Sequence, residues 1–170
     1  MTEVARLNIR KITEQDFDSV WEIFHSVVAA GITYPYEPTT SKEQAYVMWM
    51  PSLNEKRSTY VALLKDEIVG TYYIKPNLPG LGSHVANAGY MVHPDKCGLG
   101  IGRAIGEHSL VEAKKLGYKA MQFNAVVSTN IASITLWEKL GFKRIGVVPA
   151  AFNHQEKGLV DTYIMHRFLE

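Results

Sequence analysis

The sequence predicts a fold that combines helices and strands (α/β in the broad sense, α+β in the strict one). Its sheet is expected to be mixed and mostly antiparallel, with about seven strands flanked by helices. Short segments rich in β-branched and aromatic residues alternate with segments of helical apolar spacing, and strands occur both before and after helices. The predicted order is βααβββαβαββ. Because 170 residues suit one domain, and neither a repeat nor an interdomain linker is visible, we expect a single domain over residues 1–170.

Composition and charge argue against several classes of protein. Eighteen Lys and Arg residues against seventeen Asp and Glu residues give a formal charge of +1, too little to attract nucleic acid or an anionic membrane. The apolar runs Val27 to Ala30 and Val61 to Leu64 are too short to span a bilayer, and residues 1–10 lack a signal core. The single Cys97 cannot form an internal disulfide. We expect a soluble, cytoplasmic protein without nucleic acid or membrane partners.

The first half of the chain is predicted to contain strands at residues 7–12, 59–64 and 68–74, a helix from Thr13 to Gly31 and a helix from Ser41 to about Met50. Thr13 with Asp16 resembles a capping box, and Ser41 is an N-cap residue. The segment between the helices, residues 32–40, carries two prolines and two tyrosines. It is expected to be ordered but irregular, and able to wall a pocket.

The second half is predicted to contain strands at residues 84–92, 120–127, 142–148 and 161–168, and helices at 101–116 and 131–140. Gly117 and Gly141 end the two helices. A polar loop from Phe152 to Gly158 is expected to separate the last two strands.

Three glycines at alternate positions, Gly98, Gly100 and Gly102, stand directly before the predicted helix at residue 101. Such a loop lets successive N–H groups point at one spot, where the helix N-terminus adds partial positive charge. We expect an anion there, most simply a phosphate group. The alternative is that the glycines serve close helix packing, on a small-residue face formed by Gly102, Gly106, Ser109 and Ala113.

The loop departs from two common phosphate-binding signatures. A P-loop needs Gly-Lys-Ser/Thr, whereas Gly102 is followed by Arg103 and Ala104. The dinucleotide fingerprint needs Gly or Ala in its last place, where this chain has Arg103 or Ile105, depending on the glycine from which one counts. The sequence therefore favours neither ATP nor NAD.

Cys97-Gly98-Leu99-Gly100-Ile101-Gly102 resembles the acetyl-CoA loop of the GNAT N-acetyltransferase superfamily, Arg/Gln-x-x-Gly-x-Gly/Ala, and departs from it at Cys97. Residues 130–142 resemble the family's second signature, with Ser133 and Trp137 in place of the usual Ala and Tyr. The resemblance covers nearly the whole chain, since the predicted order of elements is also that of the family. A narrower resemblance, over residues 123–149, is to the fungal branch that acetylates the proline analogue azetidine-2-carboxylate and also carries the Trp.

The resemblance implies that the fourth and fifth strands separate and that backbone groups of Met91 and Val92 pair with the pantetheine arm of acetyl-CoA. An N–H on that edge, such as that of Val92, could also stabilise the thioester oxygen as an oxyanion, which we count as a catalytic role. The other cofactor-binding residues implied are Cys97, Gly98, Leu99, Gly100, Ile101, Gly102, Arg103, Asn130, Ser133 and Trp137. For Asn130 the alternative is an N-cap, and its match to the family motif favours the role close to the cofactor.

The sequence defines the residues that bind the acceptor amine less clearly than those that bind the cofactor. A free amine with a pKa of about 10.4 is almost entirely protonated at pH 7, so a base or a water chain is needed. Asn87 and Asn124 are candidates for catalytic and substrate-binding roles, with a cross-strand hydrogen bond as an even alternative for each. Asn87 could hold a water. The substrate-binding candidates from the irregular segment are Tyr34, Tyr36 and Glu37, with packing as an even alternative for the two tyrosines.

The predicted function is acetyl-CoA-dependent transfer of an acetyl group to a small-molecule amine, such as an amino acid or proline analogue, by direct attack in a ternary complex. The alternatives are a protein N-terminal or lysine acetyltransferase and a non-catalytic acyl-CoA sensor. The six histidines form no metal-binding motif, so no metal is expected, and Cys97 is a poor nucleophile candidate. A homodimer is left open.

Overall fold

The computed structural model describes residues 7–50 and 56–170, and within them it confirms seven strands and four α-helices in the predicted order. The strands are β1 (Asn8–Lys11), β2 (Ser58–Leu64), β3 (Glu67–Pro76), β4 (Val85–Val92), β5 (Ala120–Val127), β6 (Lys143–His154) and β7 (Gly158–Phe168). The helices are α1 (Phe17–Ala29), α2 (Lys42–Trp49), α3 (Ile101–Lys115) and α4 (Ile131–Lys139). Short 3-10 turns lie at Glu14–Asp16, Gly80–Gly82 and Pro94–Lys96.

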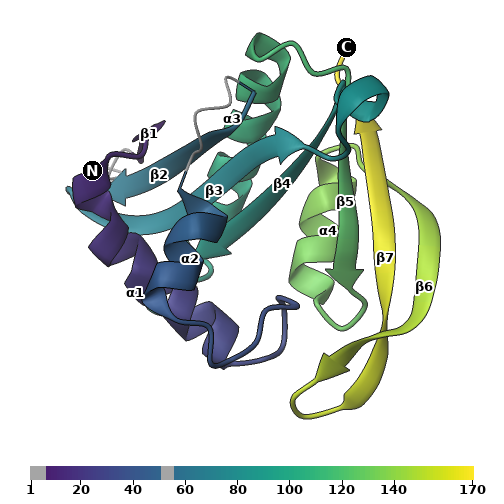
Figure 1. Cartoon of the computed structure of the whole chain (residues 1–170), viewed down its shortest axis with the longest axis horizontal. Helices are drawn as coiled ribbons and strands as arrows, with labels where there is room; N and C mark the ends of the chain where they lie inside the picture. Colours follow the sequence, from purple (N-terminus) through teal and green to yellow (C-terminus); the bar gives the residue numbers. More distant parts are fainter. Residues whose placement is uncertain (1–6, 51–55) are drawn as a thin grey trace, which may run out of the picture.

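The seven described strands form one sheet of order β1-β2-β3-β4-β5-β7-β6, in which the β4–β5 pair is parallel and the other pairs are antiparallel. The parallel pair is short, since only Val85 with Ala120 and Ala86 with Met121 are in register. Beyond these residues the two strands diverge, which leaves an opening in the middle of the sheet (Figure 1).

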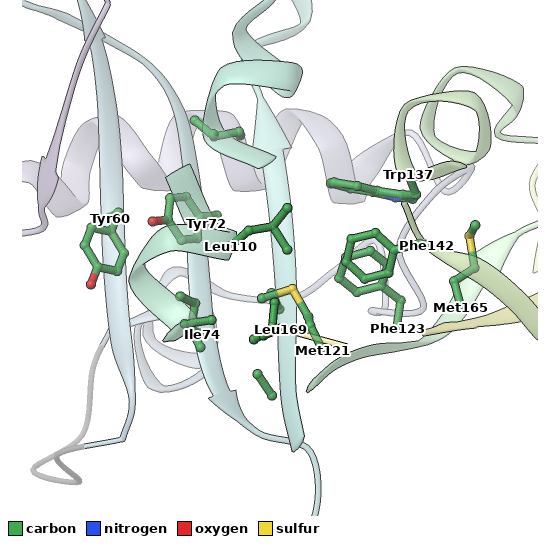
Figure 2. Packing of buried hydrophobic residues seen from close by; sticks show 14 of the residues in the cluster. Tyr60, Tyr72, Ile74, Leu110, Met121, Phe123, Trp137, Phe142, Met165 and Leu169 are labelled. Carbon is green, nitrogen blue, oxygen red and sulfur yellow. The ribbon is translucent and has the colours of Figure 1, made fainter. Parts of the chain in front are cut away.

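The two faces of the sheet carry separate hydrophobic cores because side chains alternate along each strand. On one face α1 and α2 pack through Val20 and Trp49 against Val61 and Tyr73. On the other, α3 and α4 cover a cluster that includes Tyr72, Ile105, Met121, Phe123 and Trp137. Figure 2 shows Trp137, Phe123 and Phe142 gathered at one end of this second core.

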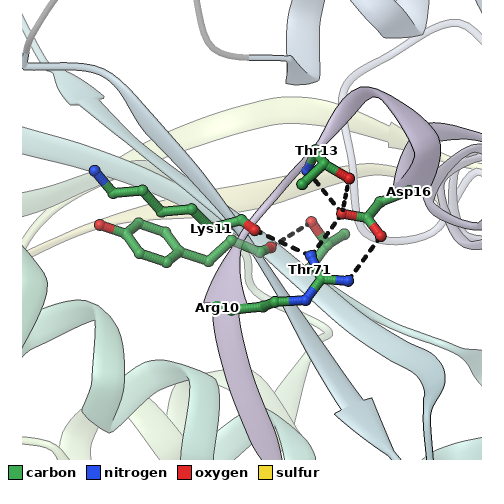
Figure 3. Close-up of polar contacts among 6 residues, drawn as sticks. Arg10, Lys11, Thr13, Asp16 and Thr71 are labelled. Atoms are coloured by element: carbon green, nitrogen blue, oxygen red, sulfur yellow. Dashed lines mark hydrogen bonds and ion pairs between the residues drawn. The ribbon is translucent and has the colours of Figure 1, made fainter.

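The predicted capping box at Thr13 and Asp16 is confirmed and joins β1 to α1. The Thr13 N–H donates to Asp16 Oδ2 at 2.7 Å, and Arg10 donates two hydrogen bonds to the same carboxylate, at 2.7 and 2.9 Å (Figure 3). The hydrogen bonds from Arg10 hold the pKa of Asp16 at about 2 despite its burial. Ser41 also caps α2 as predicted, accepting a hydrogen bond from the Gln44 N–H.

The polar loop predicted from Phe152 to Gly158 is wrong. β6 continues to His154 and β7 begins at Gly158, with Phe152 opposite Val160, so only residues 155–157 form the turn. Phe152 and His154 are each 6% exposed, and their burial with the ladder bonds of β7 outweighs the polar composition of the segment. The Gln155 N–H donates to the Gly31 carbonyl at 3.0 Å, so the hairpin tip contacts the chain just after α1.

Candidate active site

A cleft of about 660 Å³ lies at the opening between β4 and β5. Its walls come from these strands, Tyr73 of β3, the end of α1, residues 32–36, the glycine loop, the first turn of α3 and one face of α4. The predicted site residues that line it are Tyr34, Tyr36, Asn87, Met91, Val92, Cys97, Gly98, Gly100, Ile101, Gly102, Asn124, Asn130, Ser133 and Trp137. Three predicted site residues, Glu37, Leu99 and Arg103, are not among the lining residues.

The glycine loop leaves the start of α3 without a side-chain cap. Gly98 and Gly100 adopt φ values of +80° and +77°, which L side chains rarely adopt, and a Cβ at either position would meet no atom within 4 Å. Gly100 is the N-cap of α3 and contributes no side-chain hydrogen bond to the first turn. The N–H groups of that turn can therefore bind an anion, with the helix dipole in support.

The alternative role, close packing, belongs to a different glycine. A Cβ on Gly106 would lie 2.9 Å from Leu140 Cδ1 and 3.1 Å from Trp137 Cζ3, so α3 and α4 approach closely there. Gly98 and Gly100 have no such neighbours. Close packing therefore explains Gly106 but neither Gly98 nor Gly100, for which anion binding stays a prediction.

The backbone groups of β4 alternate between the β3 side and the opening. Asn77 donates to the Val85 carbonyl and His93 donates to the Val69 carbonyl, so odd-numbered β4 residues pair with β3. Met91 belongs to this set, and the backbone role that the resemblance implies for it does not fit the register. The groups of Val92 point to the opening, as the same resemblance implies.

Tyr34 fixes the irregular segment to the open edge of β4. Its hydroxyl accepts a hydrogen bond from the Tyr90 N–H at 2.6 Å and donates one to the Tyr90 carbonyl at 2.7 Å. Burial raises the pKa of Tyr34 well above its ordinary value. The hydroxyl thus satisfies two backbone groups of the diverging strand and stays protonated.

Asn87 and Asn124 lie in a chain of amides across the opening. The Asn87 side-chain NH₂ donates to the Gln122 carbonyl at 3.0 Å, which links β4 to β5 where they begin to diverge. The Asn124 side chain donates to Asn77 Oδ1 at 2.7 Å and accepts from Gln122 Nε2 at 3.0 Å. The cross-strand alternative is therefore present for Asn87, and both residues also line the cleft.

Asn130, Ser133 and Trp137 bring α4 to the cleft. Asn130 Oδ1 accepts a hydrogen bond from the Ser133 N–H at 3.2 Å, so the predicted N-cap is confirmed. Trp137 is 7% exposed and packs on Tyr90 and Phe123, with ring centroids 4.6 and 4.7 Å away.

Sequence reasoning missed several aromatic residues that line the cleft, chiefly Tyr73, Tyr90 and Phe123. Tyr73 lies over Gly89, where a Cβ would come within 2.6 Å of the ring, so this glycine admits the tyrosine. Strand alternation gave a usable signal, because Tyr73 shares its sheet face with Asn87 and Gly89.

The cleft is rich in neutral polar groups and poor in bases. None of the described residues that line it is Asp, Glu or His. Burial raises the pKa of the lining tyrosines Tyr34, Tyr36, Tyr73 and Tyr90, which keeps them as phenols. Lys96, also in the lining, is paired with Glu67 at 2.9 Å.

Residues 7–50 and 56–170 contain no group of three or more His, Cys, Asp or Glu side chains that could hold a metal ion. No helix in the same part of the chain is long and apolar enough to cross a membrane.

A family model described as the Acetyltransferase (GNAT) family matches residues 17–142. N-acetyltransferase aca1 of Schizosaccharomyces pombe is 34% identical over 155 residues, which cover 91% of this chain and 67% of that protein. Protein SPT10 of Saccharomyces cerevisiae is 33% identical over 87 residues, which cover 51% of this chain but 14% of that protein.

Solved structures agree with the family match. A GCN5-related N-acetyltransferase from Kribbella flavida has a TM-score of 0.92 and 40% identity, covering 96% of this chain and 98% of that one. A phosphinothricin acetyltransferase from Sinorhizobium meliloti, solved in complex with AcCoA, shares the fold, with a TM-score of 0.87 and 22% identity over 96% of this chain and 88% of that one. The separated strands and the glycine loop are thus those of an acyltransferase. The chain belongs to the GNAT family of acetyltransferases.

Proposed function

We propose that this protein transfers the acetyl group of acetyl-CoA to the amine of a small molecule by direct attack in a ternary complex. The observation that carries the proposal is one cleft with two different sides, an uncapped helix N-terminus at one and a wall of neutral tyrosines and amides at the other. An anionic cofactor suits the first side and an uncharged amine suits the second.

The cofactor side fits acetyl-CoA through its backbone. The N–H groups at the start of α3, after Gly98 and Gly100, would hold the phosphates, while Val92 and the α4 residues Asn130, Ser133 and Trp137 would line the arm. Acetyl-CoA supplies the activated acetyl thioester. The Val92 N–H would stabilise the negative charge that develops on the acetyl oxygen during attack.

The acceptor side is assigned to Tyr34, Tyr36, Asn87 and Asn124, to which we add Tyr73. The nitrogen lone pair forms the new N–C bond, the C–S bond breaks, the amine proton passes to water and CoA leaves as its thiolate. Amide and phenol groups can orient the amine and a water, but they do not remove its proton. Glu37 is exposed and outside the lining, so it has no part in this proposal.

The acceptor class and the setting are further parts of the proposal. The resemblance to the azetidine-2-carboxylate branch supports an amino acid or a proline analogue as acceptor. The absence of acidic residues among the described lining residues weighs against a basic protein tail. The lone, exposed Cys97 suits a reducing cytoplasm.

A screen of amino acids, polyamines and a lysine-containing peptide, with detection of released thiol, tests the proposal. We expect turnover with at least one small amine and weaker turnover with the peptide. Calorimetry with acetyl-CoA accompanies the screen. Preference for the peptide would favour a protein acetyltransferase, and binding of acetyl-CoA without any turnover would favour an acyl-CoA sensor.

A further inference from the structure

Two cationic residues outside the cleft lining share a sheet face with the lining residues Tyr73 and Asn87. Lys75 of β3 is in register with Asn87 of β4. Arg57 directly precedes β2, and because Ser58 is in register with Ile74, the same register puts Arg57 opposite Lys75. Arg57, Lys75 and Asn87 therefore form a row across three strands, next to the row that contains Tyr73.

No acidic side chain of the described residues, 7–50 and 56–170, pairs with Arg57 or Lys75. The Nε atom of Arg57 is buried and has no hydrogen-bond partner. Buried polar groups normally have a partner, so this N–H is an unsatisfied donor.

The two charges also lie within electrostatic reach of each other and of the cleft wall. Burial first, and the charge of Arg57 second, lower the pKa of Lys75. The charge of Arg57 also acts on the phenols of Tyr36 and Tyr73, and Lys75 Nζ lies 5.5 Å from the centroid of the Tyr73 ring. Two like charges in a partly buried site are unfavourable unless an anion joins them.

A purely structural role accounts for only part of this arrangement. Arg57 donates from Nη2 to the Met48 carbonyl at 2.5 Å, near the C-terminal end of α2, as an arginine often does. That bond uses neither the buried Nε–H of Arg57 nor any group of Lys75. The remaining donors match a carboxylate, whose two oxygens accept from a guanidinium and an ammonium together.

We propose that Arg57 and Lys75 bind the carboxylate of the acceptor, which makes the acceptor an amino acid whose amine lies beside Tyr73 and Asn87. This inference rests on the proposed function and names the substrate class of the same cleft.

The test compares two matched pairs of acceptors, azetidine-2-carboxylate with azetidine and alanine with ethylamine. The wild-type protein should acetylate each acid with a kcat/KM at least about tenfold above that of its partner without the carboxylate. Lys75→Met should lower kcat/KM for the acids about tenfold or more, mainly through KM, and change the values for the simple amines less than about twofold. Lys75→Arg should restore most of the loss.

Lys143→Met provides the matched control, since Lys143 is an exposed lysine of β6 outside the cleft. Equal use of acid and simple amine by the wild type, or an equal loss for both in Lys75→Met, would overturn the carboxylate site and leave the acetyltransferase proposal standing. Turnover of polyamines alone would do the same. If acetyl-CoA binds but no amine reacts, the proposed function itself fails. Because Arg57 also supports α2, Arg57→Lys rather than a neutral variant tests the second cation, and it should retain the preference for acids.

Discussion

The two sides of the cleft are built from different parts of the polypeptide. The proposed cofactor side consists largely of backbone, namely the N–H groups after Gly98 and Gly100 and the open edge of β4 at Val92. The proposed acceptor side consists of side chains, with Tyr34 from one segment and Tyr73 and Asn87 from two strands. A backbone site depends on conformation and tolerates exchange of its side chains. A side-chain site changes with every substitution, so specificity is expected to reside there.

The strongest test of the backbone side is Gly100→Val, for which we expect more than about a hundredfold loss of acetyl-CoA affinity. The φ of +77° is unfavourable for a β-branched residue by about 1 to 2 kcal/mol, so the loop must change to relieve the strain. Calorimetry measures the affinity, and circular dichroism with a thermal melt measures the fold.

Gly117→Val is the matched control. Gly117 lies at the other end of α3, with a φ of +86° and no atom within 4 Å of an added Cβ. Both variants should lose similar stability, but only Gly100→Val should lose acetyl-CoA. Unchanged affinity in a folded Gly100→Val protein would refute the assignment of the cofactor loop.

The acceptor side predicts a characteristic pH dependence. Since the described lining contains no Asp, Glu or His, and the raised pKa values of Tyr34, Tyr36, Tyr73 and Tyr90 keep these residues protonated, the amine must enter in its neutral form. We expect kcat/KM to rise about tenfold per pH unit until the pH reaches the pKa of the acceptor itself.

Acceptors with different amine pKa values separate this explanation from a protein base. The midpoint of the profile should move with the acceptor, by about as much as its amine pKa differs. A midpoint near pH 7 that stays fixed across acceptors would show that the protein contributes a titrating base, and the picture of a neutral acceptor side would be wrong.

Much of the fold could be predicted because the signals are local. Periodicity, caps at Thr13 and Ser41, and helix-ending glycines depend on residues a few positions apart. The polar turn was misplaced because its strands are held by pairing between β6 and β7, which outweighs local composition. The same holds for Met91, since the direction of a backbone group depends on the register with β3.

The residues of the cleft also differ in whether local sequence or strand pairing determines their place. The glycine loop was predictable from six consecutive residues, and the structure places most of them at the cleft. Alternation could have placed Tyr73 on the face of Asn87, but only once the β3–β4 register was known, and Tyr90 gave no such signal. The row of Arg57, Lys75 and Asn87 likewise exists only through the registers of three strands.

Trp137 lines the cleft, and Trp137→Phe should reduce kcat less than about tenfold. Indole has no usefully acidic proton, so Trp137 cannot protonate the departing thiolate, and a thiol with a pKa of about 8.5 leaves near neutral pH with little help. Phenylalanine keeps much of the packing on Tyr90 and Phe123. Steady-state kinetics of a folded Trp137→Phe variant that binds acetyl-CoA measure this loss. A loss of more than about a hundredfold would give Trp137 a chemical role.

Cys97→Ser should have the smallest effect, a change in kcat/KM of less than about twofold. Cys97 is the exposed residue at which the chain departs from the family's loop pattern, and its Sγ donates only a weak hydrogen bond to the His93 carbonyl, at 3.8 Å. Serine preserves the size and the polarity of the group, and the anion site consists of N–H groups that the substitution leaves in place. If Cys97 instead carried the acetyl group, the serine variant would lose about a thousandfold or more in kcat while still binding acetyl-CoA, because an alcohol of ordinary pKa is a far weaker nucleophile than a thiolate. Steady-state kinetics with both substrate concentrations varied give a second test for a covalent intermediate on Cys97. Double-reciprocal plots should intersect if the amine attacks directly in a ternary complex. Parallel plots together with an inactive serine variant would establish a covalent intermediate on Cys97. The effect of Cys97→Ser would then be among the largest and not the smallest.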